Sequence, residues 1–574
     1  MNSNPNLRNI TLNTSYKDGL ELDVAIVGAG VSGLYSAYRF KTDTSGNAPK
    51  EVQIFEMSDR IAGRLESVVL PGMVITGELG GMRYLDSQQI VTKLIEEVFA
   101  GDLHHIDFPM GDPADLLLYL RKQRFHADAW DKAQKHGKKL ETRYYLNDDD
   151  EGFSADQLFN KIIYDVLVAD PWFRSKYHGK VANPSKYNYE FKLTSENWDD
   201  IKPNLTYNFS GPYEGLKVND LGFWNLVKDQ VSEEGYTFLD VAGGYYSNTI
   251  NWNAAEAFPY MVGDFSSATV TYKTIDGGYD LIAYSLAYHY LKFDNAAIWS
   301  ENQLLTINQS GGGKRKYQLV FLNKATNLQW NVYADQVILG MPRRSLELLD
   351  QDGFLFKTQG LQYHMESVIM EPSFKLLMGF EEPWWKELLN ATSGHSITDL
   401  PMRQCYYFGT DPNDSHSMFL ASYNDMQTVT FWKALDDNHP ERFEPKATRF
   451  MSLAAVEDIK NKASKVMIDE AMNQVRELHG DQSIPDPYVA LYKDWADDPF
   501  GGGYHAWKAA YNVKETMEFM RKPNPAEDIY ICGEAYSDQQ GWVEGAFCVS
   551  EKMLQKYFKM ERPVWLPVDY YLGW

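Results

Sequence analysis

A glycine-rich turn between a short apolar strand and a helix limits the fold of this chain more than any other feature. The stretch 23–28 predicts a buried parallel strand, and the stretch 31–40 predicts a helix. A Gly-x-Gly-x-x-Gly motif stands between them, formed by Gly28, Gly30 and Gly33. These glycines permit a tight turn, a close approach of the backbone to a pyrophosphate, and close packing of the helix on the strand. The motif therefore predicts a dinucleotide site at the helix N-terminus.

An acidic residue ends the next predicted strand, which covers 52–56. Glu56 follows Gly33 by 23 residues, where a carboxylate accepts hydrogen bonds from ribose hydroxyls. An acid at this position disfavours the 2′-phosphate of NADP, so FAD or NAD is expected. Ser32, inside the turn, is a further candidate contact of the cofactor.

Composition excludes several classes of protein. The chain has 574 residues, which predicts about three to four domains, and its net charge of −24 disfavours a nucleic-acid partner. Three cysteines without paired spacing predict neither a disulfide framework nor a zinc site, and no metal is expected. No apolar stretch is long enough to span a membrane, and the polar N-terminus resembles no signal peptide. A cytoplasmic location is expected, although a processed secreted form would look the same.

Two segments at opposite ends of the chain resemble the flavin amine oxidase family. The first is Asp59-Arg-Ile-Ala-Gly-Arg64, in which Ala62 replaces a glycine of the family pattern, and the second runs from Gly533 to Ala546. The resemblance implies a bound FAD. It also implies that the cofactor contacts the following residues: Gly63, Arg64, Gly533, Glu534, Gly541, Trp542 and Val543.

A third segment narrows the resemblance. Gly77-Glu-Leu-Gly-Gly-Met-Arg83 is similar to the block that L-amino-acid oxidases and L-amino-acid 2-monooxygenases place beside the flavin ring. The resemblance implies that Gly81, Met82 and Arg83 contact the cofactor and that Arg83 pairs with the substrate carboxylate. A guanidinium suits this role because it is always charged and presents a planar fork. The alternative is an Arg83 bonded to a flavin phosphate or to a neighbouring aspartate.

Two residues on predicted strands complete the implied site. Tyr423 is similar to the tyrosine that gives the carboxylate its second hydrogen bond, and Lys375 to the lysine that holds a water near flavin N5. The alternatives are a tyrosine at the edge of the core and a lysine that points outward to solvent. A lysine between Phe374 and Leu376 is costly on a buried strand unless it has a partner.

Aromatic residues are implied in front of the flavin. Trp542 and Phe500 match the positions that hold the reacting Cα–N bond, and Trp495 resembles a tryptophan at the flavin edge, although a core position is the alternative for Trp495. Tyr504 replaces the cysteine through which some amine oxidases attach the flavin. A non-covalent FAD is therefore expected.

The predicted fold is α/β, with a discontinuous Rossmann-type FAD-binding domain interwoven with a mixed α+β substrate-binding domain and a mostly helical insertion. The FAD-binding domain is expected at 20–69, 266–345 and 501–560, and the substrate-binding domain at 70–119 and 346–500. The insertion is expected at 120–265, between an N-terminal tail or strap (1–19) and a C-terminal tail (561–574). The segment 87–101 predicts one helix with Ser87 as its N-cap.

The implied activity is the oxidation of L-amino acids by hydride transfer from Cα to flavin N5, with oxygen as the final acceptor. The products would be a 2-oxo acid, ammonia and hydrogen peroxide. Three alternatives stay open: an L-amino-acid 2-monooxygenase that forms the amide, an amine or polyamine oxidase, and a flavin-holding protein without activity. The expected partners are a small L-amino acid and O2, with no membrane or nucleic acid, and family members are usually homo-oligomers.

Overall fold

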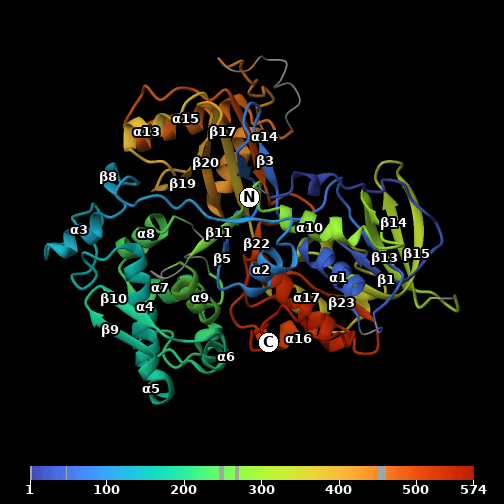
Figure 1. Ribbon diagram of the computed structural model, residues 1–574. Helices are drawn as coiled ribbons and strands as arrows, with labels where there is room; N and C mark the ends of the chain where they lie inside the picture. The colour runs from blue at the N-terminus through green and yellow to red at the C-terminus, as the bar shows by residue number, and fades with distance from the viewer. Residues whose placement is uncertain are drawn as a thin grey trace.

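The computed structural model describes residues 3–44, 46, 48–244, 251–265, 271–313, 315–437, 439–449, 451 and 460–574. Three parts meet where the small strands β5, β11 and β22 lie, at the centre of Figure 1. No helix within these ranges is long and apolar enough to cross a membrane. The domain boundary predicted at residue 266 lies outside the described residues.

A seven-stranded sheet carries the first part. It has the order β12 (Ile298–Trp299), β2 (Val52–Phe55), β1 (Leu20–Val27), β15 (Leu328–Leu339), β14 (Tyr317–Asn323) and β13 (Asn302–Gln309), and β23 (Ile529–Ile531) also pairs with β15. The strands from β12 to β15, and β23, run parallel, whereas β13 and β14 are antiparallel. Strands from three distant segments of the chain therefore share one sheet, and their carboxyl ends meet at one edge.

Helices cover both faces of this sheet. The residues of α1 (Val31–Thr42), α10 (Leu281–Tyr290) and α17 (Val543–Tyr557) pack in one apolar cluster with β1 and β2. On the other face, α16 (Val513–Arg521), α11 (Arg343–Glu347) and α12 (Leu361–Met365) pack with β13, β14 and β15. The N-terminal segment, with a short helical turn at Pro5–Arg8, lies over this part as a strap, since Leu7 is fully buried in the first cluster.

A second seven-stranded sheet forms the next part, at the top of Figure 1. Its order is β21 (Val489–Asp494), β17 (Ser373–Phe380), β20 (Ser417–Asp425), β19 (Gln404–Thr410), β18 (Gly394–Thr398), β7 (Leu117–Leu120) and β8 (Gln123–His126). All of its pairs are antiparallel except β18 with β7. The helices α13 (Trp384–Leu389), α14 (Gln427–Asp437) and α15 (Lys465–His479) pack on one face.

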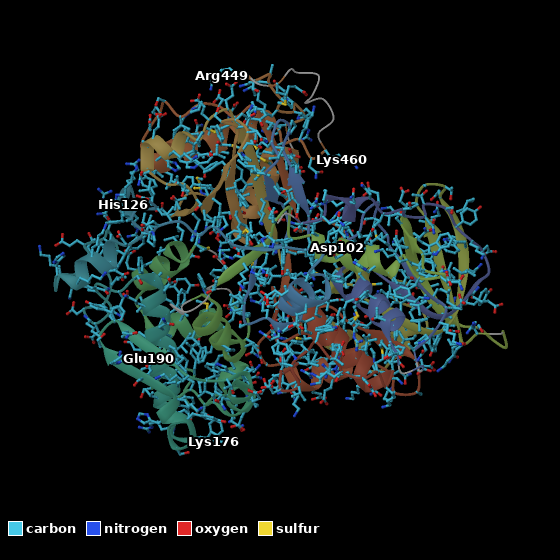
Figure 2. The ribbon with its side chains drawn as sticks, viewed as in Figure 1. Asp102, His126, Lys176, Glu190, Arg449 and Lys460 are labelled. Carbon is cyan, nitrogen blue, oxygen red and sulfur yellow. The ribbon has the colours of Figure 1, made fainter. Side chains whose placement is uncertain are left out.

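The segment predicted as a helical insertion is mostly helical within the described residues. It contains α3 (Ala129–Lys135), α4 (Ala155–Ala169), α5 (Pro171–Tyr177), α6 (Ser195–Asn204), α7 (Phe223–Gln230), α8 (Glu233–Ala242) and α9 (Ala254–Tyr260), with its own apolar cluster. It also holds a hairpin, β9 (Val181–Ser185) and β10 (Asn188–Phe191), and β8 extends the second sheet. Charged side chains such as Lys176 and Arg449 lie at opposite outer ends of the molecule (Figure 2).

Three small sheets connect these parts. They consist of β3 (Ser67–Val69) with β4 (Thr76–Glu78), β11 (Tyr272–Ile275) between β5 (Tyr84–Leu85) and β6 (His105–Asp107), and β16 (Val368–Glu371) with β22 (Tyr504–Trp507). The second and the third join residues that are far apart in the sequence, whereas β3 and β4 form a local hairpin. They fix the position of the first sheet relative to the second.

A helix is present within the predicted segment 87–101, but the N-cap predicted at Ser87 is wrong. The structure has a short α2 (Gln89–Lys93) followed by a π-helical turn (Leu94–Val98), and Gln88 stands at the N-cap. Glu544 explains the change, because its two carboxylate oxygens accept the N–H groups of Ile90 and Val91, each at 2.8 Å. A carboxylate from a distant part of the chain thus satisfies the first turn that Ser87 was expected to cap.

Candidate active site

The turn after β1 leaves no room for side chains. A Cβ on Gly33 would lie 2.0 Å from the Gly28 carbonyl oxygen, and a Cβ on Gly28 would lie 2.4 Å from the Gly340 oxygen. Gly28 also has a φ of 105°, which L side chains rarely adopt. Gly30 precedes α1 and offers no side-chain cap, so the first N–H groups of this helix can bind an anion.

The carboxylate of Glu56 lies beside this turn. Its Oε2 accepts the Ala29 N–H at 2.8 Å, and its Oε1 accepts the N–H and the hydroxyl of Ser58 at 2.9 and 2.8 Å. These bonds fix the carboxylate at the end of β2 while further lone pairs remain on both oxygens. The geometry matches an acid that can accept hydrogen bonds from a ribose.

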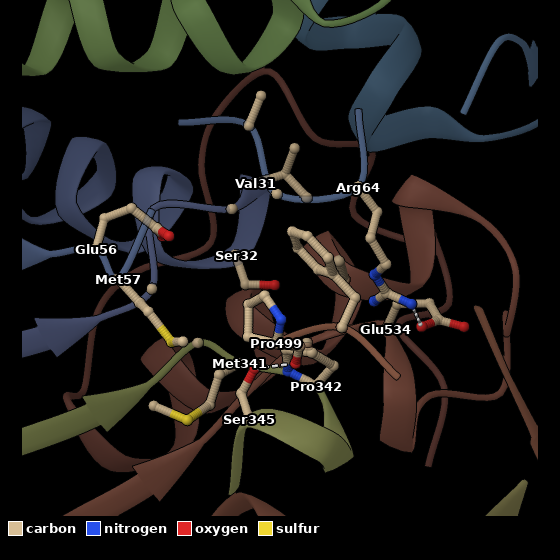
Figure 3. A pocket seen from close by; sticks show the side chains of 18 of the residues that line it. Val31, Ser32, Glu56, Met57, Arg64, Met341, Pro342, Ser345, Pro499 and Glu534 are labelled. Atoms are coloured by element: carbon tan, nitrogen blue, oxygen red, sulfur yellow. Dashed lines mark hydrogen bonds and ion pairs between the residues drawn. The ribbon is translucent and has the colours of Figure 1, made fainter. Parts of the chain in front are cut away.

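A cleft runs along this edge of the sheet (Figure 3). It is lined by Phe500 and by most of the predicted cofactor contacts, namely Gly28, Gly30, Ser32, Glu56, Gly63, Arg64, Gly81, Gly533, Glu534, Gly541, Trp542 and Val543. The other predicted residues do not line it: Gly33, Met82, Arg83, Lys375, Tyr423 and Trp495. Gly33 packs the helix on the strand, as the motif predicts, and Met82 lies in an apolar cluster.

Sequence reasoning missed other lining residues, among them Met57, Tyr504, Met341, Pro342 and Ser345. A signal existed for the last three. They follow β15, whose apolar end runs into Gly340, and parallel strands present their carboxyl ends at one edge. The position of Tyr504, where some amine oxidases attach the flavin, was a signal as well, but no comparable signal marked Met57.

An ion pair between a partly buried arginine and a buried glutamate joins the two ends of the chain in this cleft (Figure 3). Arg64 Nη1 lies 2.8 Å from Glu534 Oε2, and His505 Nδ1 lies 3.0 Å from the same oxygen. The backbone N–H of Gly541 donates to Oε1 at 2.8 Å. Burial alone would raise the pKa of Glu534, but Arg64, His505 and this N–H outweigh it, and the pKa falls to about 2. Glu534 is therefore a fixed anion.

A second bare backbone segment faces the glycine turn. A Cβ on Gly63 would lie 3.2 Å from the Gly30 Cα, and Ala62, where the family has a glycine, adopts a φ of 78°. The cleft thus combines exposed backbone from two turns, a free helix N-terminus and a ribose-oriented acid. These features fit an extended dinucleotide such as FAD.

Lys375 and Trp495 hold three consecutive carbonyl groups behind the cleft. Lys375 Nζ donates to the oxygens of Glu78 and Gly80 at 3.2 and 2.6 Å, and Trp495 Nε1 donates to Leu79 at 2.7 Å. The next residue, Gly81, lines the cleft and donates its N–H to Arg64 at 3.1 Å. Both side chains therefore position the segment that ends at Arg83.

Lys375 points inward, with 2% of its surface exposed. Burial lowers its pKa to about 7; Glu78 opposes the shift and Arg83 adds to it. Burial likewise raises the pKa of Glu78 to about 8. The ammonium lies 4.4 Å from the ring centre of Tyr423, its antiparallel partner across β17 and β20. The structure thus brings Lys375 and Tyr423 together.

Arg83 lies between two aromatic rings. Its guanidinium carbon is 4.1 Å from the centre of Tyr272 and 5.3 Å from that of Phe108, and Nη1 approaches Met110 Sδ at 3.2 Å. These contacts hold the flat face of the guanidinium, and its planar edge suits a carboxylate. Burial, together with Arg83, lowers the pKa of His395 to about 4, so that neighbour is neutral.

Aromatic side chains stand at the predicted positions. Trp542 and Phe500 line the same cleft, and Trp542 is the N-cap residue of α17. Trp495 packs edge-on against Phe500, with ring centres 5.1 Å apart. Among the described residues, no group of three or more His, Cys, Asp or Glu side chains could hold a metal, and Cys405, Cys532 and Cys548 are buried free thiols.

The chain is similar to several named proteins over most of its length. It is 26% identical to aplysianin-A of Aplysia kurodai over 94% of this chain and 91% of that protein, and 25% identical to achacin of Lissachatina fulica over 94% and 93%. It is also 24% identical to an L-amino-acid oxidase of Mus musculus over 91% and 68%.

The fold is similar to that of solved flavoenzymes. A triple mutant of putrescine oxidase superposes with a TM-score of 0.61 at 15% identity, covering 93% of this chain and 98% of that one. The profile of the family described as "Flavin containing amine oxidoreductase" matches residues 31–548. The predicted resemblance and fold class are confirmed, and FAD is the cofactor. The chain belongs to the flavin containing amine oxidoreductase family.

Proposed function

We propose that this flavin amine oxidoreductase oxidises L-amino acids to 2-oxo acids, with release of ammonia and hydrogen peroxide. The observation that carries the proposal is the position of Arg83, held by Tyr272 and Phe108 at the end of the segment that Lys375 and Trp495 fix beside the cleft. A substrate without a carboxylate has no use for a guanidinium held in this way. Similarity to proteins named L-amino-acid oxidase supports the same substrate class.

FAD, when bound, supplies a two-electron acceptor that O2 can reoxidise. The protein's part is to bind and orient the substrate. Arg83 and the Tyr423 hydroxyl grip the carboxylate, while Trp542 and Phe500 confine the amine and the reacting Cα–H bond. Three contacts, from the carboxylate, the amine and the side chain, must fit at once, which selects the L enantiomer.

Lys375 has a separate role in this proposal. Two of its three N–H donors are used by the carbonyl oxygens of Glu78 and Gly80, which leaves one for a water molecule near the flavin. Because the pKa of Lys375 lies at about 7, this group can hold or release a proton in the neutral range. Tyr504 stands where some amine oxidases have the cysteine that attaches the flavin, which is consistent with a non-covalent flavin.

The test is anaerobic bleaching of the purified yellow protein by a panel of L-amino acids, D-amino acids and amines. Fast bleaching by L-amino acids alone is expected and would identify the preferred side chain. Bleaching by the decarboxylated amines at equal rates would overturn the proposal. Product analysis then separates an oxidase, which yields the 2-oxo acid, from a 2-monooxygenase, which yields the amide.

The remaining expectations are proposals of the same kind. A homo-oligomer is tested by light scattering of the holoprotein, where a monomer mass would contradict it. A cytoplasmic location is tested by fractionating the source cells, where activity in the medium would contradict it.

A further inference from the structure

The N-terminal strap carries a charged side chain that the proposed reaction does not use. Arg8 Nη2 lies 2.5 Å from Oδ1 of Asp280, the N-cap residue of α10, and donates to the Gly277 carbonyl oxygen at 2.9 Å. A Cβ on Gly278 would lie 2.7 Å from this Nη2 atom, so the glycine turn before α10 leaves room for the guanidinium. The strap is therefore joined to a buried carboxylate of the first part of the molecule.

Hydrogen bonds continue from Asp280 to Glu78, the last residue of β4. The N–H of Ser67 donates to Asp280 Oδ2 at 3.2 Å, and the N–H of Asp280 donates to Ser67 Oγ at 3.1 Å. The Ser67 hydroxyl in turn donates to Glu78 Oε2 at 2.7 Å, and Glu78 Oε1 accepts the Tyr279 N–H at 2.8 Å. Two buried carboxylates thus share one serine.

Glu78 also reaches Lys375, but through its main chain. Its carbonyl oxygen accepts a hydrogen bond from Lys375 Nζ at 3.2 Å, and the Gly80 oxygen accepts another at 2.6 Å. Neither of these contacts involves a charged oxygen. Arg8, Asp280, Ser67, Glu78 and Lys375 therefore form a continuous series of contacts from the strap to the segment beside the cofactor cleft.

The charges in this series influence one another because the carboxylates and the lysine are buried. Burial raises the pKa of Glu78 to about 8, and Asp280 adds to this shift. Burial also raises the pKa of Asp280, but Arg8 opposes that change. An ionised Asp280 thus favours a neutral Glu78. A neutral Glu78 gives no support to the ammonium of Lys375, whose pKa is lowered to about 7 by burial.

The other charged groups around this series are already paired or act in the same direction. Arg83 adds to the lowering of the pKa of Lys375. Lys493, opposite Lys375 across β17 and β21, lies 2.9 Å from Glu66, and Arg60 lies 3.4 Å from the same oxygen. The remaining ionisable groups are phenols, which are neutral near pH 7, and they belong to Tyr279, Tyr284 and Tyr423. Among the described residues, Arg8 is therefore the cation that contacts Asp280.

We propose that Arg8 is a positioning residue for the proposed reaction: it holds Asp280 ionised, and the ionised Asp280 keeps Glu78 neutral, so that Lys375 can lose its proton near neutral pH. This inference rests on the role proposed above for Lys375. Without Arg8, Asp280 would bind a proton more readily and Glu78 would ionise. The charge of Glu78 would then hold the proton on Lys375.

The test is the pH dependence of flavin reoxidation by O2 in the FAD-loaded protein, followed by stopped flow after photoreduction with EDTA and without any amino acid. The wild type should show an inflection near pH 7 that Lys375→Met removes. Arg8→Met should move this inflection upward by about one pH unit, because an ionised Glu78 stabilises the ammonium. Arg8→Lys keeps a charge against Asp280 and should keep the wild-type inflection.

The matched control is Lys17→Met, which removes one positive charge from an exposed position of the same strap and should not move the inflection. Flavin content after gel filtration shows whether each variant is folded. If Arg8→Met does not fold because Asp280 is left unpaired, the double variant Arg8→Met/Asp280→Asn removes both charges together and should show the same upward shift.

The outcomes separate this inference from the proposals on which it depends. An inflection that Lys375→Met removes, but that Arg8→Met or the double variant leaves in place, overturns this inference alone. An inflection that persists in Lys375→Met overturns the role of Lys375 and this inference with it. Because light reduces the flavin, neither result depends on the identity of the substrate.

Discussion

Buried charges have different partners in the cofactor cleft and in the wall behind it, which consists of Lys375, Trp495 and the carbonyl groups that they bind. Glu534 in the cleft is surrounded by Arg64, His505 and the Gly541 N–H, and its pKa is about 2. Lys375 in the wall donates only to neutral carbonyl oxygens, and its pKa is about 7. A charge with full counter-partners is fixed at all ordinary pH values, whereas a charge with neutral partners changes near pH 7. The cleft therefore holds a permanent charge beside the cofactor site, whereas the wall changes its charge with pH.

The largest effect is expected in the cleft, from Gly33→Ala. A new Cβ would lie 2.0 Å from the Gly28 carbonyl oxygen, and neither backbone segment can move away without opening the turn. We expect loss of bound FAD and a large loss of folded protein. The ratio of flavin to protein absorbance after gel filtration measures this. Gly101→Ala, where nothing lies within 4 Å of the new Cβ, is the control and should retain its flavin.

The next effect concerns the proposed carboxylate grip. Arg83→Met should lower kcat/KM for the preferred L-amino acid by about 100-fold or more, because a charge-assisted, two-point contact is lost. Flavin content should stay unchanged, since Arg83 does not line the cleft. Arg83→Lys, which keeps the charge but not the fork, should fall between the two. Equal efficiency in the Met variant and the wild type would contradict the assignment.

Lys375→Met tests the response of the wall to protons. In the wild type, the rate of flavin reoxidation should change through about pH 7 as Lys375 loses its proton, and the Met variant should lack that inflection. Lys386→Met, at an exposed position on α13, is the control and should keep it. Stopped-flow rates between pH 6 and 9 decide the matter, and an inflection that persists in Lys375→Met would assign it to another group, with Glu78 as the first candidate.

The same substitution has a consequence for stability. The pKa of Lys375 is about 7 in the folded protein and has its ordinary value of 10.5 in the unfolded chain, so the unfolded chain binds more protons between these pH values. This group therefore makes the free energy of unfolding rise with pH across that window. Denaturant titrations of Lys375→Met should show a smaller rise than those of Lys386→Met.

Features of the site that depend on local sequence could be predicted, whereas contacts between distant segments could not. The glycine turn, Glu56 and the strands around them depend on local patterns, and the structure has strands at 20–27 and 52–55 and a helix at 31–42. Family motifs indicated Arg83 and Lys375 but not their neighbours. Tyr272 and Phe108 reach Arg83 through the small sheet formed by β5, β11 and β6, a pairing that no local pattern encodes. The same reason explains why the local sequence predicts Ser87 as the cap of a helix whose first N–H groups Glu544 satisfies instead.

Glu544 gives the smallest and most specific test. It follows Trp542 and Val543 of the cleft, caps α2 and accepts the Tyr570 hydroxyl at 2.7 Å, and burial raises its pKa to about 7. Tyr570→Phe removes one of the hydrogen bonds that Glu544 accepts and should lower the free energy of unfolding by about 1 kcal/mol.

Tyr570→Phe should keep its FAD, because the cleft consists of backbone turns and the Arg64–Glu534 ion pair, which Tyr570 does not contact. Tyr145→Phe, at a position 84% exposed, is the control and should unfold like the wild type. A Tyr570→Phe variant that loses FAD would show that the C-terminal segment supports the cleft directly. The cleft would then depend on long-range contacts, as the wall does, and not on local sequence alone.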